Sequence, residues 1–196
     1  MIKDAETESL IITQILVEPD ISRLMYELYV NRPDVFKHSI KVAYLVSKVC
    51  NLSNINQILI DNKLDAIRGA LLHDFGKLDI SNKILHKRDK LNEDDLYIIE
   101  QHPIYGYNRI KDIDSLSAIV KDIVLHHHEN LKGTGYPDQL NDINLITQLV
   151  SICDKYDALT EHRSYKKAIT SHEALQIIYN ENNLNQELFL LVSDCV

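Results

Sequence analysis

The sequence predicts an all-α protein, a single-domain helical bundle. Three observations support this class: apolar residues recur with helical spacing along most of the chain, the alternation typical of strands is absent, and only 5 glycines and 4 prolines interrupt 196 residues. A chain of this length normally forms one domain with a substantial core. We predict an N-terminal helical extension, residues 1–34, packed on a main domain of residues 35–196.

The first helices are predicted at residues 5–17 and 20–31, and the second ends before Pro33 because a residue that precedes proline avoids helical dihedral angles. The next helix, residues 35–50, has an apolar stripe at helical spacing. His38 lies on that stripe, so we expect its side chain to face inward.

A helix over residues 55–73 is predicted to end at the pair His73-Asp74. Directly after an apolar helical run these two side chains are held in nearly dry surroundings, where an unpaired carboxylate is costly unless a cation meets it. Taken alone, such a pair is more often a core histidine hydrogen-bonded to its neighbour. His38, His102, the histidines at 126–128 and Asp154 lie in or beside other helical segments, however, and ligands from several helices are typical of an iron, manganese or zinc centre inside a bundle.

Asn92 and Asp95 predict the N-cap pair of a helix that runs to about residue 101, and His102, directly before Pro103, is predicted to mark a helix end. Ser115 is predicted to cap the following helix.

In that helix His127 follows Ile123 by four residues and would point inward, although the spacing of the apolar residues slightly favours His126. The remaining helices are predicted at 145–161, after a capping box of Thr170 and Glu173, and at 185–194.

Composition and charge exclude several classes of function. The formal net charge of −8 argues against a nucleic-acid groove or a basic membrane surface. No apolar run approaches the length of a membrane span, and the N-terminus has the wrong flanks for a signal peptide, so we expect a cytoplasmic protein. Three widely spaced cysteines, Cys50, Cys153 and Cys195, fit small apolar residues in a reducing compartment rather than disulfides or a zinc ribbon.

The order of motifs resembles an HD-GYP domain, the branch of the HD superfamily known for cyclic di-GMP phosphodiesterases. The resemblance runs from about residue 35 to 192 and rests on seven segments in order: His38-Ser39, His73-Asp74-Phe75-Gly76-Lys77, His102-x-x-x-Gly106, His127-His128-Glu129, Gly135-Tyr136-Pro137, Asp154-x-x-Asp157-Ala158-Leu159 and Arg163-x-Tyr165-Lys166. Each segment alone is a weak signal, but seven in order are specific.

The resemblance implies a helical bundle of the HD-domain type with two divalent transition metal ions, iron or manganese, in its core. The implied ligands are His38, His73, Asp74, His102, His127, His128 and Asp154, with Asp74 bridging the two ions. It thus selects His127 and His128 from the triplet, against the slight preference of spacing for His126. A third ion could be held through Asp34, one helical turn before His38, but Asp34 after Pro33 equally suits a helix N-cap, so we expect two ions.

Two bridged ions would lower the pKa of a shared water, and the resulting hydroxide would attack the phosphodiester of cyclic di-GMP to give pGpG, with GMP as a further product. Asp74 and Lys77 are the predicted catalytic residues, Lys77 reaching the scissile phosphate.

Tyr136 and Gly135 of the only glycine-rich loop, together with Arg163 and Lys166, are predicted to bind substrate. Lys132 and Ser164 stand where the family usually has Asp and Pro, which affects loop shape rather than the metal centre.

The alternatives are an HD phosphohydrolase for another cyclic dinucleotide or a mononucleotide, and a module that senses a nucleotide without turnover. Only 37 residues precede His38, fewer than a sensor domain needs, so we expect regulation through a homodimer or a separate protein.

Overall fold

The computed structural model describes the whole chain except residues 1, 53–55, 88, 162–168 and 182. The described residues form helices and no strand, which confirms the predicted all-α class. The first half of the chain contains α1 (Ile2–Leu16), α2 (Pro19–Asn31), α3 (Pro33–Val49), α4 (Gln57–Asp61), α5 (Lys63–Leu72), the 3-10 helix η1 (Phe75–Asp79), α6 (Asn82–Leu85) and α7 (Glu93–Ile99). The second half contains α8 (His102–Ile110), α9 (Ala118–His126), α10 (Leu145–Thr160), α11 (Ser171–Glu181) and α12 (Gln186–Ser193).

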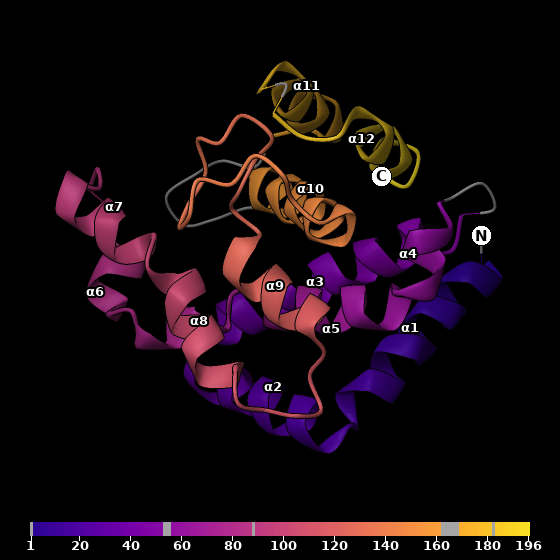
Figure 1. Cartoon of the computed structure of the whole chain (residues 1–196), viewed down its shortest axis with the longest axis horizontal. Coiled ribbons are helices and arrows are strands. Elements are labelled where there is room, and N and C mark those ends of the chain that lie inside the picture. The colour runs from indigo at the N-terminus through magenta and orange to yellow at the C-terminus, as the bar shows by residue number, and fades with distance from the viewer. Residues whose placement is uncertain (1, 53–55, 88, 162–168, 182) are drawn as a thin grey trace.

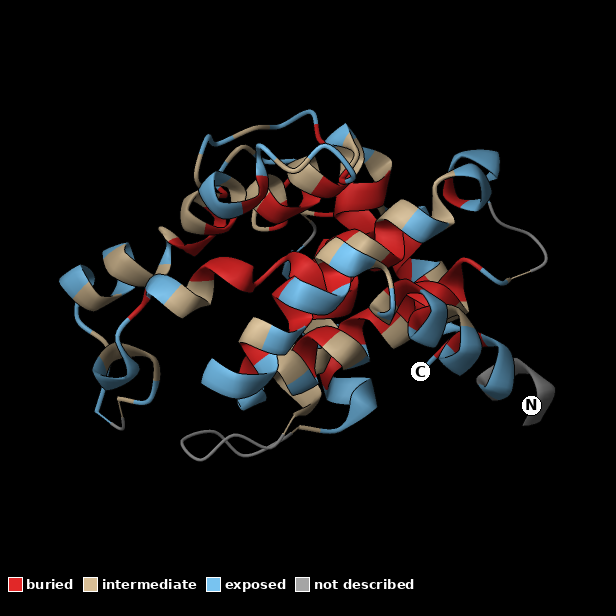
Figure 2. Ribbon diagram, turned by 90° about the horizontal axis from the view of Figure 1, so that it is seen from below, coloured by how far each residue is buried: buried red, intermediate tan, exposed pale blue. Residues whose placement is uncertain are grey.

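Helices α3, α5, α9 and α10 surround the centre of the bundle, where α5 packs on α3 and α9, and α10 packs on α3. Small and branched residues of α5 lie against these neighbours without exposure, among them Ala66, Ile67 and Ala70. Helix α10 is buried from Ile146 to Asp154. In Figure 2 the buried residues gather in this centre, so side chains that point into it are removed from water.

The N-terminal helices α1 and α2 pack on α3 and on each other. They contribute Ile12, Ile15, Ile21, Leu24 and Leu28 to the same apolar core as the rest of the bundle. The boundary predicted after residue 34 stays a prediction.

At the other end, α11 and α12 cover α10 on the side away from α9 (Figure 1). Thr170 and Glu173 form the predicted capping box, since each backbone N–H donates to the other side chain. Cys50, Cys153 and Cys195 are buried free thiols, as predicted. In the described part of the chain, no helix is long and apolar enough to cross a membrane.

Two local predictions were wrong. The single helix predicted at 55–73 is divided at Asn62, whose side-chain amide donates to the Ile58 carbonyl and which occupies the N-cap position of α5 without a side-chain capping bond. The helix cap predicted at Ser115 lies instead at Ser117, whose hydroxyl accepts from the Val120 N–H, while Ser115 donates to Asp20.

His102 begins a helix rather than ending one. The preceding helix stops at Ile99, and α8 starts at His102 with Pro103 in its first turn. A first-turn proline costs no intrahelical hydrogen bond, because those N–H groups have no helical partner. The proline is therefore compatible with a helix that begins at His102.

Candidate metal centre

Seven buried or half-buried His and Asp side chains from five segments of the chain converge in the centre of the bundle. They come from the middle of α3 (His38), the end of α5 (His73 and Asp74), the start of α8 (His102), the end of α9 (His127 and His128) and the middle of α10 (Asp154). All seven residues that the sequence proposed as ligands thus lie in one place.

Asp74 reaches this position because helix α5 stops at Leu72 and the chain turns into η1. Gly76 allows the turn to touch α8: a Cβ built there would lie 1.9 Å from the His102 carbonyl oxygen and 2.4 Å from the Gly106 nitrogen. Only glycine permits this backbone approach. The glycine of the pattern His-Asp-x-Gly-Lys is therefore explained by the contact between η1 and α8.

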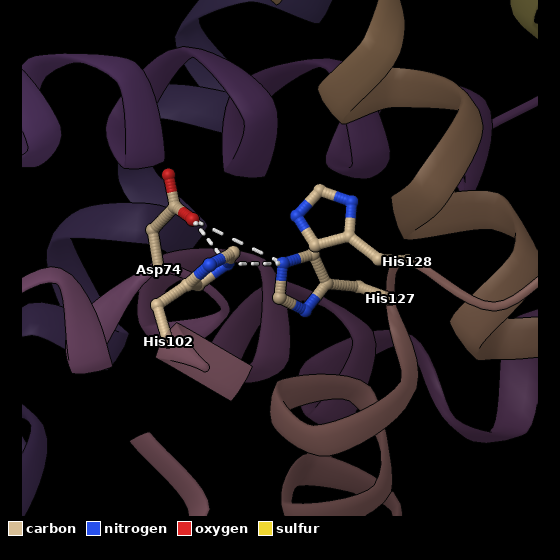
Figure 3. A group of neighbouring side chains, drawn as sticks. All are labelled: Asp74, His102, His127 and His128. Carbon is tan, nitrogen blue, oxygen red and sulfur yellow. Dashed lines mark hydrogen bonds and ion pairs between the residues drawn. The ribbon is translucent and has the colours of Figure 1, made fainter. Parts of the chain in front are cut away.

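One possible set of metal ligands comprises Asp74, His102, His127 and His128, each offering an atom within 4.8 Å of the others. Nε2 of His102 lies 3.2 Å from Asp74 Oδ1 and 3.2 Å from His127 Nε2. Figure 3 shows Asp74 and His102 facing the two consecutive histidines across a small space.

A second set comprises His38, His73 and the same Asp74. Nε2 of His73 lies 3.4 Å from Asp74 Oδ2 and 3.7 Å from Asp154 Oδ1, and Nε2 of His38 lies 2.9 Å from the same Asp154 oxygen. Both sets include Asp74, and its two carboxylate oxygens face different histidines: Oδ1 faces His102, and Oδ2 faces His73 and His38.

The ring orientation of these histidines is determined by their Nδ1 atoms. Nδ1 of His73 donates to the Ala70 carbonyl and Nδ1 of His102 to the Ile99 carbonyl, at 2.8 and 2.7 Å. Nδ1 of His127 is shared between the carbonyls of Ile123 and Val124, both at 3.2 Å. A carbonyl accepts only, so the proton must sit on Nδ1, and the Nε2 lone pair is directed into the centre.

Two polar atoms inside the centre have no hydrogen-bond partner among the described residues. His73 Nε2 and Asp74 Oδ1 are buried without a hydrogen bond, although His102 Nε2 lies within ion-pairing distance of the latter. Such atoms are costly to bury and are found where a ligand completes the site. Imidazole nitrogens and carboxylate oxygens are common ligands of first-row transition metals, so the residues fit metal ions.

The pKa values separate neutral from charged groups. Burial lowers the pKa of His128 to about 3 and lowers the pKa of His127, so both rings are neutral with free lone pairs at pH 7. For His73, burial opposes the charge, but Asp74 and Asp154 raise the pKa to about 10. Burial likewise opposes charge on Asp74, yet Lys77 and His73 hold the pKa of this carboxyl well below its usual range.

The triplet of histidines divides as the family resemblance implied. His127 is buried inside the centre, whereas His126 faces outward between Asp122 and Asp138, at 2.7 and 3.1 Å. The slight preference of apolar spacing for His126 was wrong because helix α9 ends at His126, so His127 and His128 no longer follow the helical periodicity.

The glycine-rich loop covers one side of the centre. The Tyr136 ring stacks on His128, with centroids 4.6 Å apart and an angle of 27° between the planes. A Cβ on Gly135 would meet the His128 carbonyl oxygen at 2.4 Å, so glycine is required for this contact. Glu129, which the sequence indicated only as part of a motif, is buried and accepts from the N–H groups of Asp138 and Leu140, anchoring the loop.

The remaining predicted residues have different outcomes. The Lys77 ammonium lies 2.5 Å from Asp74 Oδ2, at the rim of the centre. Asp34 is exposed, 3.9 Å from Nε2 of His86, and joins no cluster of metal-ligand side chains among the described residues. It also follows Pro33 inside the first turn of α3, so its predicted role as N-cap was wrong. Arg163, Lys166 and Ser164 lie outside the described residues.

Comparison with known proteins gives the family context. An HD domain family model matches residues 23–186. The chain is 32% identical over 164 residues to the cyclic di-GMP phosphodiesterase PA4108 of Pseudomonas aeruginosa, covering 83% of this chain and 39% of that protein. It is 38% identical over 120 residues to 3'3'-cGAMP-specific phosphodiesterase 3 of Vibrio cholerae, covering 60% and 25%.

A similar fold occurs in the solved structure of Bd1817, a protein of Bdellovibrio bacteriovorus, with a TM-score of 0.66 and 21% identity over 95% of this chain and 61% of that one. The chain thus spans less than half the length of each of these two curated relatives.

Proposed function

Because the chain belongs to the HD domain family, we propose that it is a metal-dependent phosphodiesterase that opens cyclic di-GMP to pGpG, with GMP as a further product. The observation that carries this proposal is the pair of ligand sets that share Asp74. A shared carboxylate is the arrangement that two-metal hydrolysis of phosphate esters uses. The two relatives described above are named as cyclic dinucleotide phosphodiesterases, which supports the same reaction.

We assign the metal ligands as His38, His73, Asp74, His102, His127, His128 and Asp154. When bound, two divalent ions would activate a water at neutral pH and neutralise the charge on the phosphodiester. The neutral rings of His127 and His128 favour this, since no proton competes for their lone pairs. Iron and manganese both suit such a mixed imidazole and carboxylate set, and we propose either as the native metal.

Lys77 supports the reaction from the rim. Its ammonium is held by Asp74 but its side chain is one-fifth exposed, so it can turn from the carboxylate to an incoming phosphate. An ammonium beside the scissile group stabilises charge that develops during cleavage. Arg163 and Lys166 are proposed to bind the phosphates, and Tyr136 and Gly135 to shape the wall of the site next to His128.

The choice of cyclic dinucleotide is part of the test, because one relative is named for cyclic di-GMP and another for 3'3'-cGAMP. We favour cyclic di-GMP from the order of motifs. We further propose a cytoplasmic enzyme whose main domain is residues 35–196.

The test is turnover of cyclic di-GMP, 3'3'-cGAMP and a linear dinucleotide by protein loaded anaerobically with Fe²⁺ or Mn²⁺, with products separated by chromatography. Cyclic di-GMP should be consumed and pGpG should appear, and both a chelator and Asp74→Asn should abolish the reaction. His126→Ala is the matched control, since His126 is adjacent to the ligands but turned away from them. Metal-loaded protein that leaves every cyclic dinucleotide intact would contradict the proposal.

A further inference from the structure

His38 differs from the other histidines of the centre in the partner of its Nδ1. The Nδ1 atoms of His73, His102 and His127 donate to backbone carbonyls. Nδ1 of His38 instead lies 2.7 Å from Oδ2 of the Asp157 carboxylate. Among these four rings, only that of His38 is therefore oriented by a charged side chain.

Asp157 is well placed to act on His38 alone. It lies on α10 three residues after Asp154, so both carboxylates are on the same face of the helix, one turn apart. Asp154 meets Nε2 of His38 at 2.9 Å and Asp157 meets Nδ1 at 2.7 Å. The imidazole is thus held at both nitrogens by one helix, and the Asp157 side chain is only 14% exposed.

The outer side of this contact is already neutralised by a cation. The Lys41 ammonium lies 2.5 Å from Glu161 and 4.0 Å from Asp157. His38, Asp157 and Glu161 could by their spacing hold a metal ion of their own, but Lys41 supplies the positive charge there. The Lys41 ammonium therefore compensates the negative charge of Asp157, while the other oxygen of this carboxylate accepts the hydrogen bond from His38.

We propose that Asp157 is a positioning residue that sets the affinity of one of the two metal sites, the one that contains His38. Its carboxylate keeps the proton on Nδ1, directs Nε2 to the centre, and makes the ring a stronger donor than a histidine bonded to a carbonyl. The two metal sites are thereby unequal: in one set His102 and His127 are oriented by backbone carbonyls, whereas the other set contains His38, which is oriented by Asp157. This inference rests on the proposed two-metal centre.

The consequence is selective. Outer partners of metal-bound histidines are typically worth 10- to 100-fold in metal affinity. Loss of Asp157 should lower the affinity for one metal ion by about that factor and leave the affinity for the other unchanged. The reason is that, among the described residues, no other ligand histidine is hydrogen-bonded to this side chain.

The experiment titrates the metal-free protein with Co²⁺, follows the visible absorption of the bound ion, and compares wild type with Asp157→Ala and Asp157→Asn. Asp122→Asn is the matched control, since Asp122 accepts from Nδ1 of His126 at the same 2.7 Å but His126 is not a ligand. Wild type and the control should bind two ions with unchanged affinities. Asp157→Ala should weaken one of them about 10- to 100-fold, and Asp157→Asn, whose amide oxygen can still accept from Nδ1, should recover part of the loss.

Melting of the metal-free proteins separates positioning from folding. Equal weakening of both ions in Asp157→Ala, or two wild-type affinities in that variant, would overturn the role of Asp157 while leaving the two-metal centre intact. Wild-type protein that binds fewer than two ions would overturn the metal centre itself. A fall in melting temperature without any change in Co²⁺ affinity would assign Asp157 to structure alone and also overturn the proposal.

Discussion

Replacing Gly76 by alanine should disable the centre without removing any ligand. The new Cβ would lie 1.9 Å from the His102 carbonyl oxygen and 2.4 Å from the Gly106 nitrogen, both of them backbone atoms that cannot rotate away. Real contacts of this kind are not shorter than about 3 Å, so η1 and α8 must separate by roughly 1 Å. His102 is the first residue of α8 and moves with it.

The magnitude follows from two separate effects. Overpacking of this kind costs about 1–3 kcal/mol, and each kcal/mol lowers the melting temperature of a chain this size by about 2–4 °C. Metal sites tolerate changes of only about 0.2 Å in ligand distance, so a shift of roughly 1 Å takes His102 out of coordination range of an ion shared with Asp74. We therefore expect a fall of about 2–12 °C together with loss of the ion bound by His102.

The assay combines thermal unfolding of the metal-free protein with elemental analysis after metal loading. Gly133→Ala is the control, because the φ of 64° at Gly133 makes alanine unfavourable there, while the new Cβ would face Gln139 and Asn141, which are not proposed ligands. The control should lose stability but keep its metal. Gly76→Ala protein with the melting temperature and metal content of wild type would refute the reasoning.

Three further predictions concern the ligands. Asp74→Ala should lose most of both ions in elemental analysis, because Asp74 belongs to both ligand sets, and full occupancy would contradict its shared role. His127→Ala should abolish hydrolysis while His126→Ala does not, since only His127 is buried in the centre, and equal damage by both would restore the alternative register. The affinity for the ion bound by His73 should rise about tenfold per pH unit between pH 7 and 9. The reason is that His73 has a pKa of about 10 in the metal-free protein, so below that pH it must release a proton before it can bind a cation. An affinity that does not depend on pH would contradict this.

Helical periodicity and capping residues were sufficient to predict most of the fold. The apolar stripe of α3 predicted that His38 faces inward, and His38 is buried. The capping boxes of α7 and α11 were visible in the sequence because each is a local pattern three residues apart. Local patterns of this kind depend on neighbours in the chain and need no knowledge of tertiary contacts.

The errors occurred where a helix ends, because periodicity carries no information beyond that point. His127 and His128 lie past the last turn of α9, so their directions depend on the Nδ1 contacts and on packing against α8 and α10. Asp157 was visible only as part of a motif, since its partner His38 is 119 residues away in the chain. Its role could be recognised only when α3 and α10 were seen side by side.

The central claim, a two-metal phosphodiesterase centre built around Asp74, is tested most directly by one titration. Metal-free protein is loaded anaerobically with increasing equivalents of Mn²⁺, and the rate of cyclic di-GMP hydrolysis is measured at each ratio. The rate should rise to a plateau at two ions per chain, because both ligand sets must be filled. A plateau at one ion per chain, or no hydrolysis with two ions bound, would contradict it.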